Sequence, residues 1–354
     1  TSLDPHQADL VGISLCSKIG KACYIPVGHK SPKCLKKEAV IKKLKKILED
    51  PSIKKIGQNI KFDFIVFYKC GITLSSMEDT MLMSYVLDAG KNRHNMDTLS
   101  EIHLGHKTIS FKEMVGTGKK EINFSEVELD KAKDYAAEDA DVTFRLYKKF
   151  IKNLKSEKMI NIYEIFEKPL IKILAFMEIE GVEIDSKFLK SLSSKFEKKI
   201  QKLEKEVFKI SKKEFNIASP KQLGEIIYND LKIAGLKKTK KGSFATSASV
   251  LEDLAFKGHE FPKLILDWRQ VSKLKNTYSD ALPEHLNPNT KRVHTSFLLA
   301  ATTTGRLASS DPNLQNIPIK SEDGKDIRKA FTAKKGHLLI SADYNQIEMR
   351  ILAD

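Results

Sequence analysis

The sequence contains few cysteines and lacks the patterns of several protein classes. Four cysteines stand in 354 residues, all in the first fifth of the chain and none in a C-x-x-C pair. This argues against a zinc site and predicts reduced, mostly buried thiols in a cytoplasmic protein. No stretch is long and apolar enough to span a bilayer, and no signal peptide is present, so we expect no association with a membrane. Internal repeats and low-complexity tracts are also absent.

Acidic residues are in the minority. The sequence contains 61 Lys and Arg but only 46 Asp and Glu, which gives a formal charge of +15. The excess favours an anionic partner, since a Lys or Arg that meets a phosphate releases counterions. Lysine-rich helix faces in contact with solvent explain the same charge equally well. The length of 354 residues allows two or three domains.

The two ends of the chain do not look like the ends of a natural domain. The chain starts at Thr1 without a methionine, and it stops at Asp354 within an apolar helical run that no glycine or proline terminates. We expect the chain to be cut at both ends.

The first 155 or so residues mix short apolar strands with helical patterns, which indicates an α/β fold. Residues 10–15 and 22–27 predict a hairpin, and residues 53–57 predict a buried strand. Asp79 precedes an apolar helical run and is predicted to be its N-cap.

The middle of the chain predicts helices. Apolar residues recur at steps of three and four over residues 186–213, which is typical of a long amphipathic helix. Ser219, followed by proline, predicts the start of a second helix, and Ser249 with Glu252 predicts a capping box. Residues 237–243 predict an exposed basic loop, which is either an arm laid across a phosphate backbone or a solvated turn.

The last part of the chain predicts strands and turns. Residues 293–297 predict a strand, and a polar stretch follows. Residues 338–342 predict a short buried strand that delivers Asp343 at its end, and a helix is expected to start near Asn345.

Three groups of residues carry candidate chemistry. In the first, Asp63 follows a predicted strand, and Tyr135 and Asp139 share a helix face because they are four residues apart. Phosphodiester hydrolysis needs an activated water and charge neutralisation, which two Mg²⁺ ions about 4 Å apart supply when carboxylates hold them. An exposed helix face and a simple cap are the plain alternatives.

The second group is the polar stretch 302–318, where amide and hydroxyl groups surround one arginine. Such groups can contact sugar oxygens and minor-groove acceptors that all base pairs share; the alternative is an ordinary turn. The third group begins at Asp343. A carboxylate between a buried strand and a helix is a common position for a catalytic metal ligand, and a helix N-cap is the alternative.

Together these stretches resemble DNA polymerases of family A, in the order of that family and over essentially the whole chain. Residues 58–63 resemble its second exonuclease motif and residues 135–139 the third. Residues 304–306 and 311–318 resemble the template-primer-binding stretch, and residues 341–348 resemble polymerase motif A.

The resemblance implies a fold of three parts. Residues 1–155 would form an α/β RNase H-like 3′→5′ exonuclease domain. Residues 156–285 would form the polymerase entry and a mainly helical thumb, with its lysine-rich arm at 186–255. Residues 286–354 would form the start of an α+β polymerase palm, through motif A.

The resemblance also implies a role for each matching residue. Asp63 and Asp139 would hold exonuclease metals, and Tyr135 would orient the attacking water. The positions that would grip a frayed single strand are Leu3, Asn59, Arg93 and Phe111.

On the polymerase side, Asp343 would bind both metals with help from the Tyr344 carbonyl group. Gln346 would contact the nucleotide, and Glu348 would exclude a ribose 2′-hydroxyl. The positions that would contact primer-template DNA are Arg306, Asn313, Gln315, Asn316 and Lys320. Lys320 replaces an arginine of the family pattern, so it keeps the charge without the bidentate fork.

The implied enzyme is a bacterial, cytoplasmic and monomeric DNA-directed DNA polymerase with a proofreading exonuclease, acting in replication and repair. It would use Mg²⁺ at two-metal sites in both activities, and would bind primer-template DNA, single-stranded 3′ ends and deoxynucleoside triphosphates. The family's D-x-E motif would lie just before Thr1, and its nucleotide-binding helix and H-D-E motif after Asp354, so we expect this chain alone to lack both activities. The alternatives are a stand-alone exonuclease of the RNase D type and a non-catalytic DNA-binding or scaffold protein.

Overall fold

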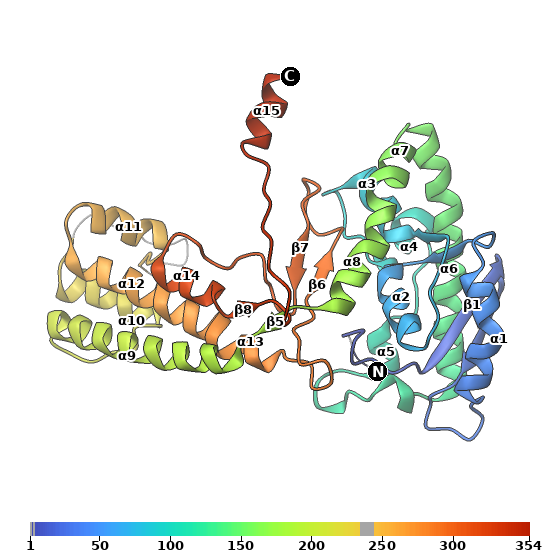
Figure 1. The fold of residues 1–354 in the computed structure, drawn as a ribbon, viewed down its shortest axis with the longest axis horizontal. Helices are drawn as coiled ribbons and strands as arrows, with labels where there is room; N and C mark the ends of the chain where they lie inside the picture. The colour runs from blue at the N-terminus through green and yellow to red at the C-terminus, as the bar shows by residue number, and fades with distance from the viewer. Residues whose placement is uncertain (1, 3, 234–243) are drawn as a thin grey trace. The chain divides into compact units, whose positions relative to one another are not determined.

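The computed structural model describes residues 2, 4–233 and 244–354 (Figure 1). Leu3 and the predicted basic loop at 237–243 therefore lie outside the described residues. The chain divides into two compact units. Unit 1 comprises Thr1–Gly181 and His294–Gln315, and unit 2 comprises Val182–Val293 and Asn316–Asp354.

Unit 1 contains short paired strands and most of the long helices of the first half of the chain. Its strands are β1 (Gly12–Lys18), β2 (Lys21–Pro26), β3 (Lys55–Gly57), β4 (Met77–Asp79), β6 (Ser296–Leu298) and β7 (Ala308–Ser310). Its helices are α1 (Lys37–Glu49), α2 (Ile60–Lys69), α3 (Thr80–Asp88), α4 (Met96–Leu104), α5 (Phe111–Val115), α6 (Leu129–Ser156), α7 (Ile160–Ile162) and α8 (Lys168–Glu180). Short 3-10 turns occupy Gly118–Lys120 and Phe124–Glu126, and a π-helical turn, Tyr163–Glu167, joins α7 to α8.

The strands of unit 1 pair as the sequence predicts near the N-terminus. β1 and β2 form an antiparallel hairpin with Ile13 opposite Ile25, and α6 packs against both strands. β3 forms within the predicted strand and pairs in parallel with β4. β6 and β7 pair antiparallel. The strand predicted at 293–297 is therefore shorter and later than expected, since β6 begins at Ser296.

The core of unit 1 forms where α2, α3, α6 and α8 meet. Its largest fully buried side chains include Phe64, Phe150 and Tyr163. Each buried side chain of this size stabilises the fold by roughly 2–3 kcal/mol through loss of apolar surface from water. The core also includes Leu299, from the returning segment His294–Gln315.

One buried ion pair fixes that returning segment. Lys61 on α2 and Glu178 on α8 form a salt bridge in which both side chains are almost fully buried. Glu178 also accepts from the Phe297 N–H at 2.6 Å, and its carbonyl oxygen bonds to Nδ1 of His294 at 2.7 Å. Because buried charges are costly without partners, this carboxylate holds three segments of unit 1 together.

Unit 2 is mainly helical. Its helices are α9 (Ser186–Ser211), α10 (Pro220–Glu225), α11 (Ala248–Phe256), α12 (Glu260–Leu274), α13 (Ala281–Glu284), α14 (Glu322–Arg328) and α15 (Ile347–Ala353), with π-helical turns at Ile226–Asp230 and Lys275–Asp280. Its strands β5 (Glu183–Ile184) and β8 (Phe331–Thr332) pair antiparallel.

The long amphipathic helix predicted at 186–213 is confirmed as α9. Its apolar stripe, which runs from Leu189 to Val207, is buried, and the helix packs against α12. The predicted cap at Ser219 is confirmed too, because its hydroxyl accepts from the Gln222 N–H. The capping box at Ser249 is wrong: α11 begins at Ala248, and the hydroxyl of Ser249 lies 3.2 Å from that of Ser247 instead.

The strand predicted at 338–342 is wrong. These residues form no strand, no described segment pairs with their backbone, and Leu338, Leu339 and Ile340 are exposed. The helix expected near Asn345 is confirmed and begins at Ile347. The four cysteines are free as expected, but none is buried; Cys70, for example, stands at the C-terminal end of α2, where its side chain partly reaches the surface.

Candidate functional site

A single buried carboxylate organises the predicted second exonuclease motif. Asp79 ends β4, opposite Gly57 of β3, and its side chain is 1% exposed. Its Oδ1 accepts from the N–H groups of Met81 at 2.9 Å and Asn59 at 3.0 Å, and its Oδ2 accepts from the Ile60 N–H at 2.9 Å. Asp79 therefore caps α3, as predicted, and also α2, which the sequence did not reveal because Ile60 lies nineteen residues away.

Asp63 stands in the first turn of α2, so the shared cap fixes its backbone. Its side chain is exposed to solvent. The protein atoms near the carboxyl group, followed by the charge of Asp79, still raise the pKa of Asp63 to about 7. Burial also raises the pKa of Asp79 to about 6, against the lowering effect of its N–H donors. Two neighbouring carboxyl groups that resist ionisation form an environment that attracts a cation.

Tyr135 and Asp139 lie together on α6, as the spacing predicts. Burial raises the pKa of Asp139 to about 7, while interaction with the Tyr135 hydroxyl lowers it. Burial and the Asp139 charge raise the pKa of Tyr135 above its ordinary value, so the phenol stays protonated. Among the described residues, Oδ1 of Asp139 is buried and has no hydrogen-bond partner.

A loop is tied to α6 beside this pair. The Glu138 carboxylate lies 2.8 Å from Nε2 of His106 and accepts from the Ile109 N–H at 2.7 Å. α5 follows, and its Phe111 is 46% exposed. The ring of Phe111 stacks on Phe124 at 5.9 Å and lies 6.1 Å from that of Tyr135. Phe124 was not predicted from the sequence, because only the fold brings its ring close to those of Phe111 and Tyr135.

The described residues contain no group of three or more His, Cys, Asp or Glu that could hold a metal ion. Asp79 is the charged neighbour of Asp63, whereas Glu138 and Asp97 are those of Asp139. Both predicted metal ligands lie in unit 1, but neither belongs to a group of three or more such side chains among the described residues. Their chemistry still fits a hard divalent cation, since both are carboxylates and one buried oxygen of Asp139 has no partner.

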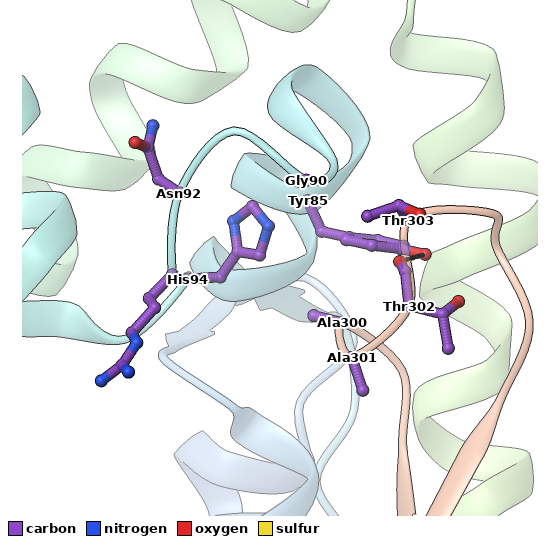
Figure 2. Close-up of a pocket in the computed structure, with 9 residues that line it drawn as sticks. Tyr85, Gly90, Asn92, His94, Ala300, Ala301, Thr302 and Thr303 are labelled. Carbon is purple, nitrogen blue, oxygen red and sulfur yellow. Dashed lines mark hydrogen bonds between the residues drawn. The ribbon is translucent and has the colours of Figure 1, made fainter. Parts of the chain in front are cut away.

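Two predicted single-strand contacts lie on exposed loops. Asn59 precedes α2 in the left-handed conformation, with φ of 57°. Arg93 is exposed and lines a cavity of about 290 Å³. The other residues that line this cavity, all labelled in Figure 2, are Tyr85, Gly90, Asn92, His94 and Ala300 to Thr303.

The predicted primer-template contacts are all exposed. Arg306, Asn313 and Gln315 belong to unit 1, and Asn316 and Lys320 belong to unit 2. The Asn313 side-chain oxygen accepts from the Ser309 hydroxyl at 3.2 Å and from the Gln315 N–H at 3.0 Å. In unit 2, the Tyr278 hydroxyl donates to the Asn316 carbonyl group at 2.5 Å.

The residues of predicted motif A lie on the exposed segment 334–354. Asp343, Tyr344, Gln346 and Glu348 are all exposed, and Gln346 adopts φ of 53° just before α15. Asp343 does not stand at the end of a strand, because the strand predicted before it is absent. In unit 2 the segment leads away from the helices (Figure 1).

Comparisons with known proteins assign both halves of the chain. A family model described as 3′-5′ exonuclease matches residues 1–155, and one described as DNA polymerase family A matches residues 186–354. The DNA polymerase I of Rhizobium leguminosarum is 47% identical over 374 residues, which cover 100% of this chain and 37% of that protein. Residues 186–354 therefore belong to DNA polymerase family A, and residues 1–155 belong to the 3′-5′ exonuclease family.

Two further matches are also DNA polymerases. The DNA polymerase I of Pseudomonas aeruginosa is 44% identical and covers 100% of the chain, which spans 39% of that protein. A solved structure, the POL domain of Pol1 from M. smegmatis in complex with DNA primer-template and dNTP, matches with a TM-score of 0.81 and 29% identity, over 99% of this chain and 57% of that one. The chain spans less than two fifths of the length of these two curated relatives.

The alternative of a stand-alone exonuclease of the RNase D type is not favoured, because residues 186–354 match the polymerase family. No described helix combines the length and the apolar character needed to cross a membrane.

Proposed function

We propose that this chain is part of a DNA-directed DNA polymerase with a 3′→5′ proofreading exonuclease, which acts in DNA replication and repair. The observation that carries the proposal is the succession of an exonuclease segment and a family A polymerase segment in one chain. The similar Pol1 structure is a complex with primer-template DNA and dNTP, which supports the same classes of partner here. We also propose a monomer in the bacterial cytoplasm.

The proposed domains follow the sequence prediction. Residues 1–155 form the RNase H-like exonuclease domain, residues 156–285 the polymerase entry and thumb, and residues 286–354 the start of the palm. The helical packing of α9 against α12 supports the thumb.

In the proposed exonuclease site, Asp63 and Asp139 hold divalent metal ions, with Mg²⁺ as the natural choice for carboxylate ligands. A bound metal ion would lower the pKa of the attacking water and neutralise charge on the leaving oxygen. The protonated Tyr135 hydroxyl, next to Asp139, orients that water. Phe111 offers an exposed aromatic face on which the terminal base stacks, and Asn59 and Arg93, with Leu3, contact the single strand.

In the proposed polymerase site, Asp343 and the Tyr344 carbonyl group hold the metal ions. Gln346 contacts the nucleotide, and Glu348 excludes the 2′-hydroxyl. The exposed polar groups that contact the duplex are Arg306, Asn313, Gln315, Asn316 and Lys320. Their exposure supports access to DNA. Side chains of this kind can contact sugar oxygens and minor-groove acceptors, which all base pairs share.

The exonuclease assignment is tested in a polymerase that carries this chain with the D-x-E motif placed ahead of Thr1. Asp139→Ala should abolish most Mg²⁺-dependent removal of 3′-terminal nucleotides, because it removes a metal ligand. Tyr135→Phe should slow removal less, since only an orienting hydroxyl is lost. Asp134→Ala, an exposed position on the same helix, is the matched control and should leave the rate unchanged.

Removal of nucleotides at the parental rate by the Asp139→Ala enzyme would show that the metal assignment is wrong. A parent with neither activity under these conditions would instead favour the non-catalytic scaffold.

A further inference from the structure

A buried tyrosine of the exonuclease segment holds the loop that carries Arg306. Tyr85 lies on α3 and is 4% exposed. Its hydroxyl donates to the Thr302 carbonyl group at 2.7 Å and accepts from the Gly305 N–H at 3.1 Å. Both bonds lie within unit 1. The single proton and a lone pair of one hydroxyl thus fix both ends of residues 302–305.

A further hydrogen bond closes the loop itself. The Thr302 hydroxyl donates to the Arg306 carbonyl group at 2.8 Å, and Gly305 adopts a left-handed φ of 79°. Together with the two main-chain bonds to Tyr85, this bond restrains the backbone from which the Arg306 side chain extends.

Gly90, which also lines the cavity in Figure 2, confines the same loop. Gly90, with φ of 83°, approaches so closely that a Cβ placed there would lie 2.7 Å from Cγ2 of Thr303. The next turn carries Arg93 and then His94, whose ring meets the Tyr85 ring edge-on at 5.6 Å.

The Tyr85 contact also reaches the exonuclease motif. The Gln58 side-chain amide donates to the His94 carbonyl group at 2.7 Å, and Nδ1 of His94 lies 2.9 Å from the Ser84 hydroxyl. Contacts therefore run without a break from the residue before Asn59 to the loop of Arg306.

We propose that Tyr85 is a positioning residue for primer-template binding: its hydroxyl anchors loop 302–306 on the exonuclease segment and thereby presents Arg306 to the duplex. The inference rests on the proposed DNA-binding role of this loop. A loop that is already ordered loses less conformational entropy when DNA binds, so loss of the anchor weakens binding without removing any contact to DNA.

The test uses the 354-residue chain and a fluorescent primer-template duplex. Tyr85→Phe keeps the ring and removes both hydrogen bonds. Hydrogen exchange of the peptide that covers 302–307 should become about fivefold faster, because the net stability that one hydrogen bond contributes changes an opening equilibrium by about that factor. Affinity for the duplex should fall about threefold to tenfold through the cost of ordering the loop. The slope of log affinity against log salt should stay unchanged, because no charge that meets a phosphate is lost.

A double-mutant cycle separates positioning from a general structural role. If Tyr85 acts through Arg306, Tyr85→Phe should cost little further affinity in a chain that already carries Arg306→Ala. Gly90→Ala disturbs the same loop at Thr303, so it should speed exchange of the same peptide. Tyr68→Phe, which removes a hydroxyl from a 40% exposed side chain, is the control and should change neither quantity.

Three results overturn the inference: unchanged exchange in Tyr85→Phe, faster exchange with full affinity, or an equal loss of affinity with and without Arg306. If Arg306→Ala itself leaves affinity unchanged, the proposed role of the loop is wrong and the inference falls with it. If Arg306→Ala weakens binding and Tyr85→Phe does not, only the inference is wrong.

Discussion

Replacing Asp139 by asparagine should stabilise unit 1 at neutral and alkaline pH. The carboxyl group is largely surrounded by protein, and one of its oxygens has no partner among the described residues. Its pKa is about 7 in the folded protein, against an ordinary value of 3.8. Ionisation therefore costs more in the folded state than in the unfolded state, and Asp139→Asn removes that cost while keeping the shape of the side chain.

The magnitude follows from the two pKa values. The difference between them corresponds to about 4 kcal/mol at about 1.4 kcal/mol per pH unit. Water penetration and relaxation around a half-buried group reduce this figure, so we expect a gain of about 1–2 kcal/mol in the free energy of unfolding of unit 1 at pH 8, without metal ions.

The sign of the pH dependence is fixed as well. A folded pKa above the unfolded value means that the folded state binds more protons between about pH 4 and pH 7. In the parent, the stability supplied by the neutral carboxyl group is present below about pH 4 and is lost as the pH rises to about 7. The advantage of Asp139→Asn should therefore be complete above pH 7 and vanish toward pH 4.

Native-state hydrogen exchange of peptides from α6, followed in urea, measures the free energy of unfolding of unit 1. Trp268 is the single tryptophan and lies in unit 2, so its fluorescence reports on the other unit. Asp134→Asn, at an exposed position of the same helix, should have little effect. A variant Asp139→Asn that is less stable than the parent at pH 8, or whose gain is the same at every pH, would refute the reasoning.

Three other expectations can be measured. Asp79→Ala removes the acceptor that caps two helices, so it should lower the stability of unit 1 by about 2 kcal/mol, twice the loss of an ordinary cap; Asp185→Ala, which uncaps α9 alone, should cost about half as much in unit 2, and equal losses would contradict the shared cap. Affinity of the chain for primer-template DNA should fall steeply with added salt, with a log-log slope of about −0.9 per phosphate contact; a flat titration would show that the charge of +15 is not used for DNA. In a full-length polymerase, Glu348→Ala should raise the ratio of kcat/KM for ribonucleotides to that for deoxyribonucleotides by about five- to 140-fold, the range given by about 1–3 kcal/mol of steric exclusion; an unchanged ratio would show that Glu348 does not exclude the 2′-hydroxyl.

The sequence predicted the parts of the fold that depend on local patterns. The stripe of α9 and the caps at Asp79 and Ser219 follow from spacing and side-chain chemistry within a few residues, and the structure confirms them. The strand predicted at 338–342 does not form. An apolar run becomes a strand only where another segment pairs with its backbone by hydrogen bonds, and no described segment does so here.

For the candidate site, the sequence could name residues without showing how they meet. Tyr135 and Asp139 were predicted to share a helix face because four residues separate them. The second cap made by Asp79 and the anchor at Tyr85 join positions far apart in the chain, 217 residues apart for Tyr85 and Thr302. Contacts of this kind have no signature in a single sequence.

The returning segment His294–Gln315 has a consequence for how the chain is made. On the ribosome, Gly181 emerges with α8 complete, yet Phe297 and Leu299 have still to be synthesised. The whole of Val182–Val293 must leave the exit tunnel before they arrive, and until then the buried pair of Lys61 and Glu178 lacks part of its cover. The first unit of this chain to begin folding therefore cannot be finished before most of the second has been translated.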